Sequence, residues 1–531
     1  MSKIMLVDLG RSEVSQEQVE PGFAHYGRGL ATHLLRRYVL ATTPRHSPEN
    51  CVVLVPGLLS GTAAPSTGRL TLAAKRCADG GCQFLNLAGP FAQKLGSLDI
   101  AAVMITGAAQ EGPVMVHIDK DGARIIPVPY LKEKTVSDTI EQVRERFGKE
   151  TAVVGIGPAG EHLLPLASVF TTYPQGIPLF NCVRGGMGDI LGSKGLKAVA
   201  VSTSAYFAAP VVDRNIMKNS ARRLARIIVD HPICGGALPA HGSITLMKIM
   251  KSGQLASLSA SQAAEPTDGD TGQAPPELAG MTGSRINRSC APLCVVRCLN
   301  RHGKGRARVF SSPAEREVSA ALEHTFDIKA PDLSSELNRG AFELGIDSVE
   351  FVFACDLYFK TLKSKATPDD LRKALREIEK LTLMGRVLGS RTDGIQSLYK
   401  DMPELHALVT RPSIEEGKRF AVRLPLKLAG FENMDDRSYL YAGMIAQGNL
   451  GICLFTSFAI FESMEAWQCL AEMVKAKTGC ETMPAELMRY AVECLQSEEE
   501  YELAAKQTAV QQGIPEFVKV LHRYFGNEVA Q

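Results

Sequence analysis

The sequence lacks the features that are typical of membrane, nucleic-acid-binding or secreted proteins. Its 59 Lys and Arg residues nearly balance 57 Asp and Glu residues, which leaves a formal charge of +2. This balance gives no broad field that would attract nucleic acid or an anionic membrane surface. No apolar run is long enough to span a membrane, and the first residues lack the apolar core and cleavage site of a signal peptide. We therefore expect a cytoplasmic protein with no nucleic-acid or membrane partner.

A disulfide framework is also not indicated. The 13 cysteines are odd in number and mostly scattered, which suits a reducing compartment better than an oxidising one. Hydrophobic residues make up 45% of the chain and charged residues 22%, as in ordinary globular proteins. A length of 531 residues allows several domains, each with its own core.

The periodicity of apolar residues changes along the chain and predicts the α+β class. Short β-branched runs between turn residues predict a β-rich N-terminal domain. The expected strands are Cys51–Val55, Ala101–Ile105, Val114–Ile118, Ala152–Ile156 and Lys197–Val201. Helical periodicity is expected at Gly27–Leu40 and Val136–Phe147, and it dominates after Pro210. The later expected helices are Arg214–Ile228, Ala314–His324, Leu333–Leu344, Pro368–Thr382, Met464–Ala476, Pro484–Leu495 and Pro515–Tyr524.

Three closely spaced cysteines are the most informative motif. Cys290, Cys294 and Cys298 follow Gln254–Ser284, a segment rich in Ser, Ala, Gly, Pro and Asp that predicts a long surface loop. A short loop can supply three thiolates to an iron-sulfur cubane, and the fourth then comes from elsewhere in the fold, here Cys453. Two alternatives remain open from spacing alone: a four-thiolate zinc site, or buried cysteines that act as small hydrophobic residues.

Glycine-rich segments in the first domain are candidates for binding an anion. They are Pro56–Arg69, Asn86–Gly89 and Arg184–Lys194. Glycine lets backbone N–H groups approach a phosphate closely, and arginine can donate two parallel hydrogen bonds to it. None of the segments is a Walker loop or a dinucleotide fingerprint. The alternative interpretation of each segment is an ordinary tight turn.

Taken in order, these motifs resemble the aldehyde:ferredoxin oxidoreductases. The resemblance rests on Gly27–Leu30, Ser47–Asn50, Gly57–Arg69, Asn86–Gly89, Gly157–Glu161, Arg184–Lys194 and the four cysteines. It implies a β-rich domain followed by two mainly α-helical domains, with the cofactors at the domain junction. In this chain the domains would be residues 1–205, 206–410 and 411–531. It also implies oxidation of an aldehyde to a carboxylate, with electrons passed to ferredoxin or another electron carrier.

The resemblance further implies which residues bind the cofactors. A [4Fe-4S] cluster would be held by Cys290, Cys294, Cys298 and Cys453. A tungsten (or molybdenum) bis-pyranopterin, with Mg²⁺ bridging its phosphates, would face eleven residues of the glycine-rich segments and of a later motif. These are Arg69, Gly68, Thr67, Asn86, Ala88, Gly89, Arg184, Gly185, Gly186, Gly188 and Asp347.

Glu315 and Glu317 occupy the place of the family's acidic residues near the metal. The resemblance implies that one of them is a base that activates water for attack on the aldehyde carbon. The alternative is that both are solvated acids in the first turn of a helix, where the helix dipole favours negative charge.

The chain also departs from the family pattern. Its cluster loop is C-x3-C-x3-C, one residue longer than the usual C-x2-C-x3-C. Phe342 and Gly448 stand where the family has the aspartates of two pterin-binding D-x-x-G motifs. Loss of each carboxylate would remove about 2–3 kcal/mol of charge-assisted hydrogen bonding. The segment before Cys453 is short, and the family's pocket histidine has no counterpart here.

Two functions follow from these observations. The first is an oxidoreductase of this type acting on a small aldehyde-like molecule. The second is a catalytically diminished paralogue that keeps the cluster and serves as an electron-transfer or assembly subunit. Association into a homo-oligomer, or with a partner subunit, is compatible with both.

Overall fold

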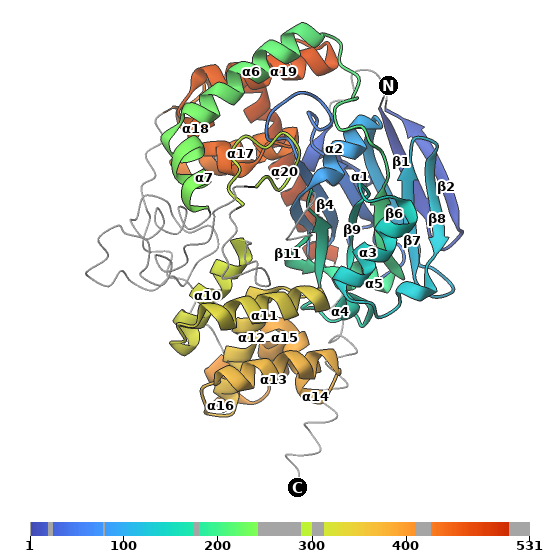
Figure 1. Cartoon of the computed structure of the whole chain (residues 1–531), viewed down its shortest axis with the longest axis vertical. Coiled ribbons are helices and arrows are strands. Elements are labelled where there is room, and N and C mark those ends of the chain that lie inside the picture. Colours follow the sequence, from blue (N-terminus) through green and yellow to red (C-terminus); the bar gives the residue numbers. More distant parts are fainter. Residues whose placement is uncertain are drawn as a thin grey trace, which may run out of the picture.

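The computed structural model describes residues 2–19, 25–77, 80–174, 180–242, 288–299, 313–409 and 426–508. A β-rich N-terminal region is followed by a largely helical C-terminal region, and the two lie against each other (Figure 1). The loop expected at Gln254–Ser284 and the helix expected at Pro515–Tyr524 lie outside the described residues. No helix in the described ranges is both long enough and apolar enough to cross a membrane.

The first sheet has the strand order β2-β1-β6-β3-β4-β5. Its strands are β1 (Lys3–Asp8), β2 (Glu13–Gln18), β3 (Val52–Pro56), β4 (Arg69–Lys75), β5 (Cys82–Ala88) and β6 (Ile100–Thr106). Strand β1 pairs with β6 in parallel, and the other neighbouring pairs are antiparallel. Strand β3 is buried along its whole length, as its uninterrupted apolar sequence requires.

The second sheet has the order β11-β10-β9-β12-β7-β8 and is also mixed, because only β12 and β7 are parallel. Its strands are β7 (Val114–Asp119), β8 (Gly122–Pro127), β9 (Ala152–Ile156), β10 (Ser168–Thr172), β11 (Phe180–Met187) and β12 (Leu196–Val201). Strands β5 and β11, each at the edge of its sheet, contact each other. The predicted phosphate-binding segments therefore meet where the two sheets come together.

The two sheets share one hydrophobic core. It includes Val52 and Leu54 of the first sheet and Val116 and Val154 of the second, all fully buried. Helices α2 (Pro90–Ser97) and α5 (Gly188–Ser193) pack within this layer. Helix α1 (Gly27–Tyr38) covers the other face of the first sheet. Helix α3 (Val136–Phe147) covers the second.

The helices form two hydrophobic clusters. One joins α6 (Arg214–Asp230), η2 (Pro232–Ala237) and α7 (Leu238–His241) to the C-terminal helices. Those helices are α17 (Asp436–Leu450), α18 (Ser457–Phe461), α19 (Met464–Thr478) and α20 (Pro484–Thr508). Helices α6 and α19 lie side by side at the top of Figure 1.

The second cluster contains the helices between residues 313 and 409. They are α10 (Pro313–Phe326), α11 (Pro331–Leu344), α12 (Ser348–Thr361), α13 (Pro368–Glu379), α14 (Leu383–Gly389), α15 (Arg391–Leu398) and α16 (Pro403–Val409). Helix α6 therefore shares its core with residues beyond 436 and not with α10–α16. The division of the chain at residues 205 and 410 stays a prediction.

Most expected elements are present within a few residues of their predicted bounds. Helix α3 and strand β9 match their predictions at both ends, and α20 continues well beyond the predicted Leu495. One correction concerns two segments interpreted as loops. Asn86 and Ala88 lie in β5, and Arg184–Met187 end strand β11. Asn86 and Ala88 pair with β4, whereas residues 184–186 form a bulge in β11, because Val183 pairs with Val169 and Met187 pairs with Ser168.

Candidate functional site

The segment that carries the three cysteines is held by one residue of the N-terminal domain. Ser66 donates its backbone N–H to the carbonyl of Leu293 at 2.9 Å, and its hydroxyl accepts the N–H of Val295 at 3.3 Å. Its carbonyl accepts the N–H of Cys453 at 2.9 Å. Ser66 therefore fixes both cysteine segments to the loop that precedes β4.

The loop of Cys453 is also paired directly with the N-terminal domain. Arg69 donates its backbone N–H to the carbonyl of Gly451 at 3.2 Å. A Cβ on Gly57 would lie 2.0 Å from the backbone nitrogen of Gly451, so the two backbones are too close for any side chain there. Gly451 has φ +84° and ends α17 in the left-handed conformation, which directs the chain towards Cys453.

Arg69 lies among the four cysteines. Its Nη2 donates to the Cys453 sulfur at 2.7 Å. Its pKa is raised because the attraction of Cys453, Cys290 and Cys298 outweighs burial, which alone would lower it. The structure therefore brings together the three cysteines of the loop and the distant fourth. The guanidinium that was expected at a pterin phosphate instead contacts a thiol, and its Nη1 donates to Asn86 Oδ1 at 3.4 Å.

The thiols influence each other's protonation. A hydrogen bond from Cys290, together with N–H groups of residues 296 and 297, lowers the pKa of Cys294 despite burial. Donation to Cys294 and burial raise the pKa of Cys290. Burial and the nearby Cys453 and Cys294 raise the pKa of Cys298. Thiols this close repel each other once deprotonated, and a bound cation would relieve that repulsion.

The remaining residues of the predicted Thr67–Gly68 segment have structural contacts. The Thr67 hydroxyl donates to the carbonyl of Ala64 at 2.9 Å and accepts Gln93 Nε2 at 2.9 Å. The carbonyl of Gly68 accepts the N–H of Gly89 at 3.1 Å. A Cβ on Gly68 would lie 2.1 Å from that of Ala291, so this glycine allows the cysteine loop to approach.

A second group of polar residues surrounds the end of β11. Arg184 Nη1 and Glu317 Oε2 are 3.0 Å apart, and Asp347 Oδ2 accepts the N–H of Gly185 at 3.2 Å. Partial burial and the nearby Asp347 raise the pKa of Glu317, and Arg184 only partly offsets this. The Glu317 side chain is 41% exposed, so its carboxyl group has both a raised pKa and access to solvent. Glu315 lies in the first turn of α10, and its side chain is outside the described part of the structure.

Gly89, which directly follows β5, lies close against β10. A Cβ on Gly89 would lie 2.6 Å from the carbonyl of Thr172 and 3.0 Å from Thr171 Oγ1. Thr171 Oγ1 is buried without a hydrogen-bond partner among the described residues. Gly185 and Gly186 have φ values of 108° and 86°, and Gly188 begins α5. A buried unpaired hydroxyl is costly, so this one suits a polar ligand beside Gly89.

The two positions that lack the family's carboxylates differ from each other. Phe342 is buried and packs against Phe180, with ring centroids 6.1 Å apart. At Gly448 no described atom lies within 4 Å of the place a Cβ would take. Asp347 caps α12 by accepting the N–H groups of Val349 and Glu350, both at 3.1 Å. Phe342 therefore fills its site, whereas Gly448 leaves space.

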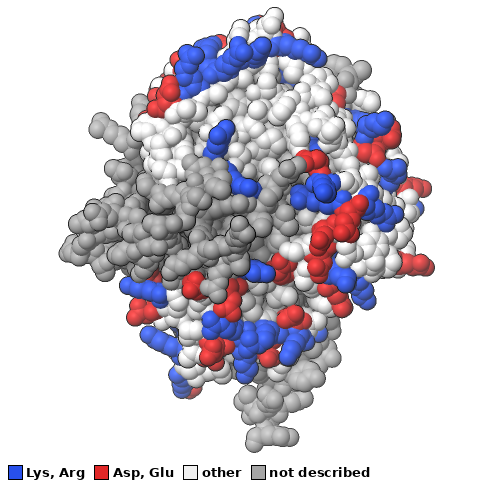
Figure 2. All heavy atoms as spheres, viewed as in Figure 1, with Lys and Arg blue, Asp and Glu red and all other residues white. Residues whose placement is uncertain are grey.

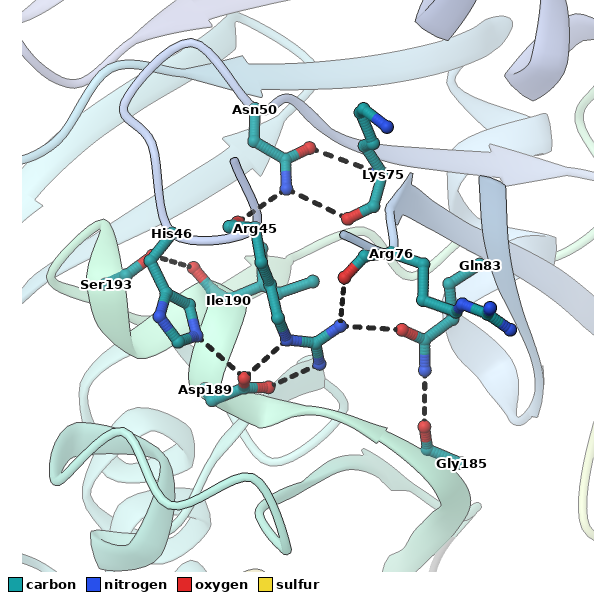
Figure 3. A network of polar contacts seen from close by, with 10 residues as sticks. All are labelled: Arg45, His46, Asn50, Lys75, Arg76, Gln83, Gly185, Asp189, Ile190 and Ser193. Carbon is teal, nitrogen blue, oxygen red and sulfur yellow. Dashed lines mark hydrogen bonds and ion pairs between the residues drawn. The ribbon is translucent and has the colours of Figure 1, made fainter. Parts of the chain in front are cut away.

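A polar network that the sequence did not reveal supports the glycine-rich strand end (Figure 3). Asp189 is buried at the start of α5, where Arg45 binds both its oxygens at 2.6 and 2.8 Å and His46 contacts it at 2.8 Å. Burial would raise the pKa of Asp189, but these hydrogen bonds hold it below its usual value. Arg45 also donates to Gln83 Oε1 at 2.9 Å, and Gln83 contacts the carbonyl of Gly185. The network thus joins β5, α5 and the loop before β3.

The residues fit the two predicted cofactors unequally. Four thiols around one guanidinium form the donor set that an iron-sulfur cubane requires. Each thiolate of a cubane binds a different iron atom, so such a site does not require three side chains to share one metal ion, and in the described ranges no three His, Cys, Asp or Glu side chains lie close enough to do so. For the pterin, Thr171, Gly89 and Arg184 are suitable, whereas Phe342 is not.

Comparison with known proteins gives the same family for the N-terminal region. The profile of the aldehyde ferredoxin oxidoreductase N-terminal domain matches residues 4–203. The tungsten-containing aldehyde ferredoxin oxidoreductase of Pyrococcus furiosus is 30% identical over 252 residues, which are 47% of this chain and 40% of that protein. The Thermococcus kodakarensis enzyme of the same name is 29% identical over the same shares. The chain thus matches well under half the length of these relatives.

Two further similarities are more distant. The WOR-like subunit of an aliphatic sulfonate oxidoreductase from Pyrococcus furiosus is 24% identical over 221 residues, 38% of this chain and 34% of that protein. Among solved structures, the active-site complex BamBC of benzoyl coenzyme A reductase, with bound 1,5-dienoyl-CoA, superposes with a TM-score of 0.76. That match covers 99% of this chain and 94% of the other at 15% identity. At this identity the similarity concerns the fold.

Proposed function

Because the chain is a distant member of the aldehyde ferredoxin oxidoreductase family, we propose that it oxidises an aldehyde-like small molecule and passes the electrons to ferredoxin. Its cofactors would be a [4Fe-4S] cluster and a tungsten or molybdenum bis-pterin, with Mg²⁺ bridging the pterin phosphates. They would lie at the junction of a β-rich domain, residues 1–205, and two helical domains, residues 206–410 and 411–531.

The observation that carries this proposal is the position of Arg69 among the thiols of Cys290, Cys298 and Cys453. When bound, a [4Fe-4S] cluster supplies one-electron transfer. The four cysteines would hold it. Arg69 would bring a fixed positive charge that offsets the negative charge of the thiolates.

The residues near β11 would bind the pterin and handle protons. When bound, the metal-pterin group supplies two-electron chemistry. The Thr171 hydroxyl would donate a hydrogen bond, and Arg184 would contact a phosphate. Glu317, whose pKa is raised, would take a proton from a water molecule that attacks the aldehyde carbon. Asp347 would orient Arg184 and the strand end.

A second candidate function is supported by the packing of Phe342 and the capping role of Asp347. Neither residue presents a free carboxylate to a pterin ring. The chain would then keep the cluster and act as an electron-transfer or assembly subunit. This alternative shares the cysteine site with the first and differs only in the metal-pterin group.

Elemental and pterin analysis of anaerobically purified protein tests both. About four iron atoms per chain are expected under either proposal. Tungsten or molybdenum with extractable pterin is expected only for the enzyme. If protein with its full complement of iron contained neither, the electron-transfer role would remain. Protein without iron, after reconstitution with iron and sulfide, would contradict both.

A matched pair of variants tests the pterin site separately. Thr171→Val removes a hydroxyl with no partner among the described residues, so we expect unchanged thermal stability and reduced pterin content. In Thr139→Val the lost hydroxyl donates to the carbonyl of Thr135 at 2.8 Å, so stability should fall while pterin content is retained. Normal pterin content in Thr171→Val would remove Thr171 from the proposed site.

A further inference from the structure

Helix α6 carries a row of cations on its outer face. Arg214, Lys218, Arg222 and Arg226 follow each other at intervals of four residues, and all four are exposed. Residues spaced by four lie on one side of a helix, so the row extends for about 18 Å along it. The opposite face, which includes Met217, Leu224 and Ile228, is buried. Figure 2 shows this row as a blue band along the top of the molecule.

The four cations of the row are not ion-paired within the described part of the chain, although Asp213 and Asp230 stand at the ends of the helix. No described residue forms an ion pair with any of the four. Arg223, which lies beside the row, is instead bound to Glu465 and Glu472, both at 3.0 Å. The chain as a whole carries only +2, so the row is a local concentration of charge. Like charges four residues apart destabilise a helix slightly, and this cost indicates a use for the row.

The row lies on the element that leads directly to the cysteine site. Helix α6 continues into η2, where the Cys234 thiol donates to the carbonyl of Phe455 at 3.3 Å. Proximity to Cys453 contributes to the raised pKa of Cys234. Cys294 and Ile452 share a hydrophobic cluster with Leu224 and Ile228 of α6. A protein bound to the row would therefore lie on the outer face of a helix whose inner face packs into the hydrophobic cluster that includes Cys294.

We propose that the cationic row of α6 is the docking surface for an acidic protein electron carrier. This inference rests on the proposed function and adds the place where electrons leave the molecule. Each transfer would oxidise the reduced cluster by one electron and reduce the carrier's redox group by one electron, with no bond made or broken. Charge complementarity would raise the association rate and orient the carrier, as at other electrostatically steered interfaces.

The shape of the charge favours a small acidic protein over nucleic acid or a membrane. The row is one residue wide, and acidic residues flank it at Asp213 and Asp230, the two ends of the helix. A membrane surface or a nucleic-acid duplex carries negative charge over a longer distance and would also meet these carboxylates. A compact acidic patch can contact the four cations alone.

The test uses the full chain and a purified acidic [4Fe-4S] ferredoxin as the probe. Lys218→Glu/Arg222→Glu reverses two charges at the centre of the row, and binding should weaken by about tenfold or more at low salt. Lys373→Glu/Arg376→Glu, on the exposed face of α13, is the matched control and should bind normally. Affinity of the unchanged protein should fall steeply as salt is added, and that of the double α6 variant less steeply.

Parallel measurements with duplex DNA and with anionic phospholipid vesicles examine the other polyanions. The proposal would be overturned if the Lys218→Glu/Arg222→Glu variant lost more affinity for DNA or for vesicles than for ferredoxin. It would also be overturned if the two double variants bound ferredoxin equally well. In protein with its cluster, reduction of a small dye should be the same in all three proteins. Protein without iron would contradict the proposed function, whereas the ferredoxin-binding measurement remains interpretable on its own.

Discussion

At the scale of single residues, Arg69 places a positive charge against a thiol that we propose as a cluster ligand. Arg69 is the first residue of β4, and its guanidinium contacts the Cys453 sulfur and the side-chain oxygen of Asn86. A cation in that position stabilises whichever state of the site carries more negative charge. For an iron-sulfur cluster that is the reduced state.

We therefore predict that Arg69→Gln lowers the reduction potential of the reconstituted cluster by tens of millivolts. The lost charge and hydrogen bond to sulfur both make electron uptake less favourable. Redox titration followed by electron paramagnetic resonance measures the shift. Arg124→Gln, at an exposed ion pair with Asp119, is the control and should leave the potential unchanged. An unaltered potential in Arg69→Gln would show that the guanidinium does not face the cluster.

Replacing Cys453 tests the most distant of the four proposed ligands. We expect Cys453→Ala to lose most of its iron and visible absorbance after reconstitution, because three ligands hold the cubane incompletely. Cys480→Ala removes an exposed cysteine and should retain both. A normal cluster in Cys453→Ala would refute the choice of fourth ligand. Iron content and absorbance are the measurements.

How far the sequence predicted the site depends on the residue. The spacing of Cys290, Cys294 and Cys298 pointed to a shared site, and the structure places them with Cys453, although their role as ligands stays a prediction. The partner of Arg69 was not predictable, because β4 meets the Cys453 loop only in the folded chain. Thr171 carried no signal, since a threonine in a strand is ordinary.

At the scale of elements, the network around Asp189 holds three segments in register. Removing one partner of a buried ion pair leaves the others unsatisfied and costs about 3 kcal/mol. The carboxylate is fully buried, and Arg45 binds both its oxygens. Asp189 therefore links α5 to the loop before β3, and through Gln83 to Gly185.

We predict that Asp189→Asn lowers the melting temperature at neutral pH by several degrees and that the difference depends on pH. The folded-state pKa of Asp189 is lowered, so its stabilisation is complete above the ordinary carboxyl pKa of about 4 and is lost as the pH falls below that value. The unchanged protein and the variant should converge in acid. Thermal unfolding between neutral pH and about pH 2 measures this, and a difference independent of pH would contradict the assignment.

Several elements that the sequence did not predict have identifiable physical causes. Helices α12 and α17 were not predicted because they have buried residues on several sides, which removes the periodic alternation that identifies a surface helix. Strand β8 is only partly buried, and β2 is largely exposed, so neither gives an apolar run. Helices with one buried face, such as α3 and α13, were predicted within a few residues.

At the scale of the whole molecule, the helical region has two separate hydrophobic clusters, and only one includes cysteines of the proposed site. Cys294 belongs to the cluster of α6, η2 and α17–α20, to which Cys298 is also packed. The cluster of α10–α16 contains Cys355 but none of the four proposed ligands. Loss of a metal cluster should therefore affect the two groups of helices differently.

We predict that removal of iron with a chelator increases amide hydrogen exchange selectively. Exchange should rise in residues 288–299 and 436–461, which contain or adjoin the cysteines, because bound metal stabilises the folded form that binds it. Residues 348–398 should be nearly unaffected. Hydrogen–deuterium exchange with mass spectrometry gives both in one experiment, and equal increases in the two groups would contradict the separation.

The contacts of Ser66 have a consequence for the biogenesis of the protein. This residue forms hydrogen bonds with residues 293, 295 and 453, which the ribosome synthesises long after residue 66. The β-rich domain can fold while synthesis continues, because its own hydrogen bonds are local to it. The place for the inorganic group, however, becomes complete only after residue 453 has emerged from the ribosome. Delivery of iron and sulfide is therefore expected to follow translation and to act on a nearly finished fold.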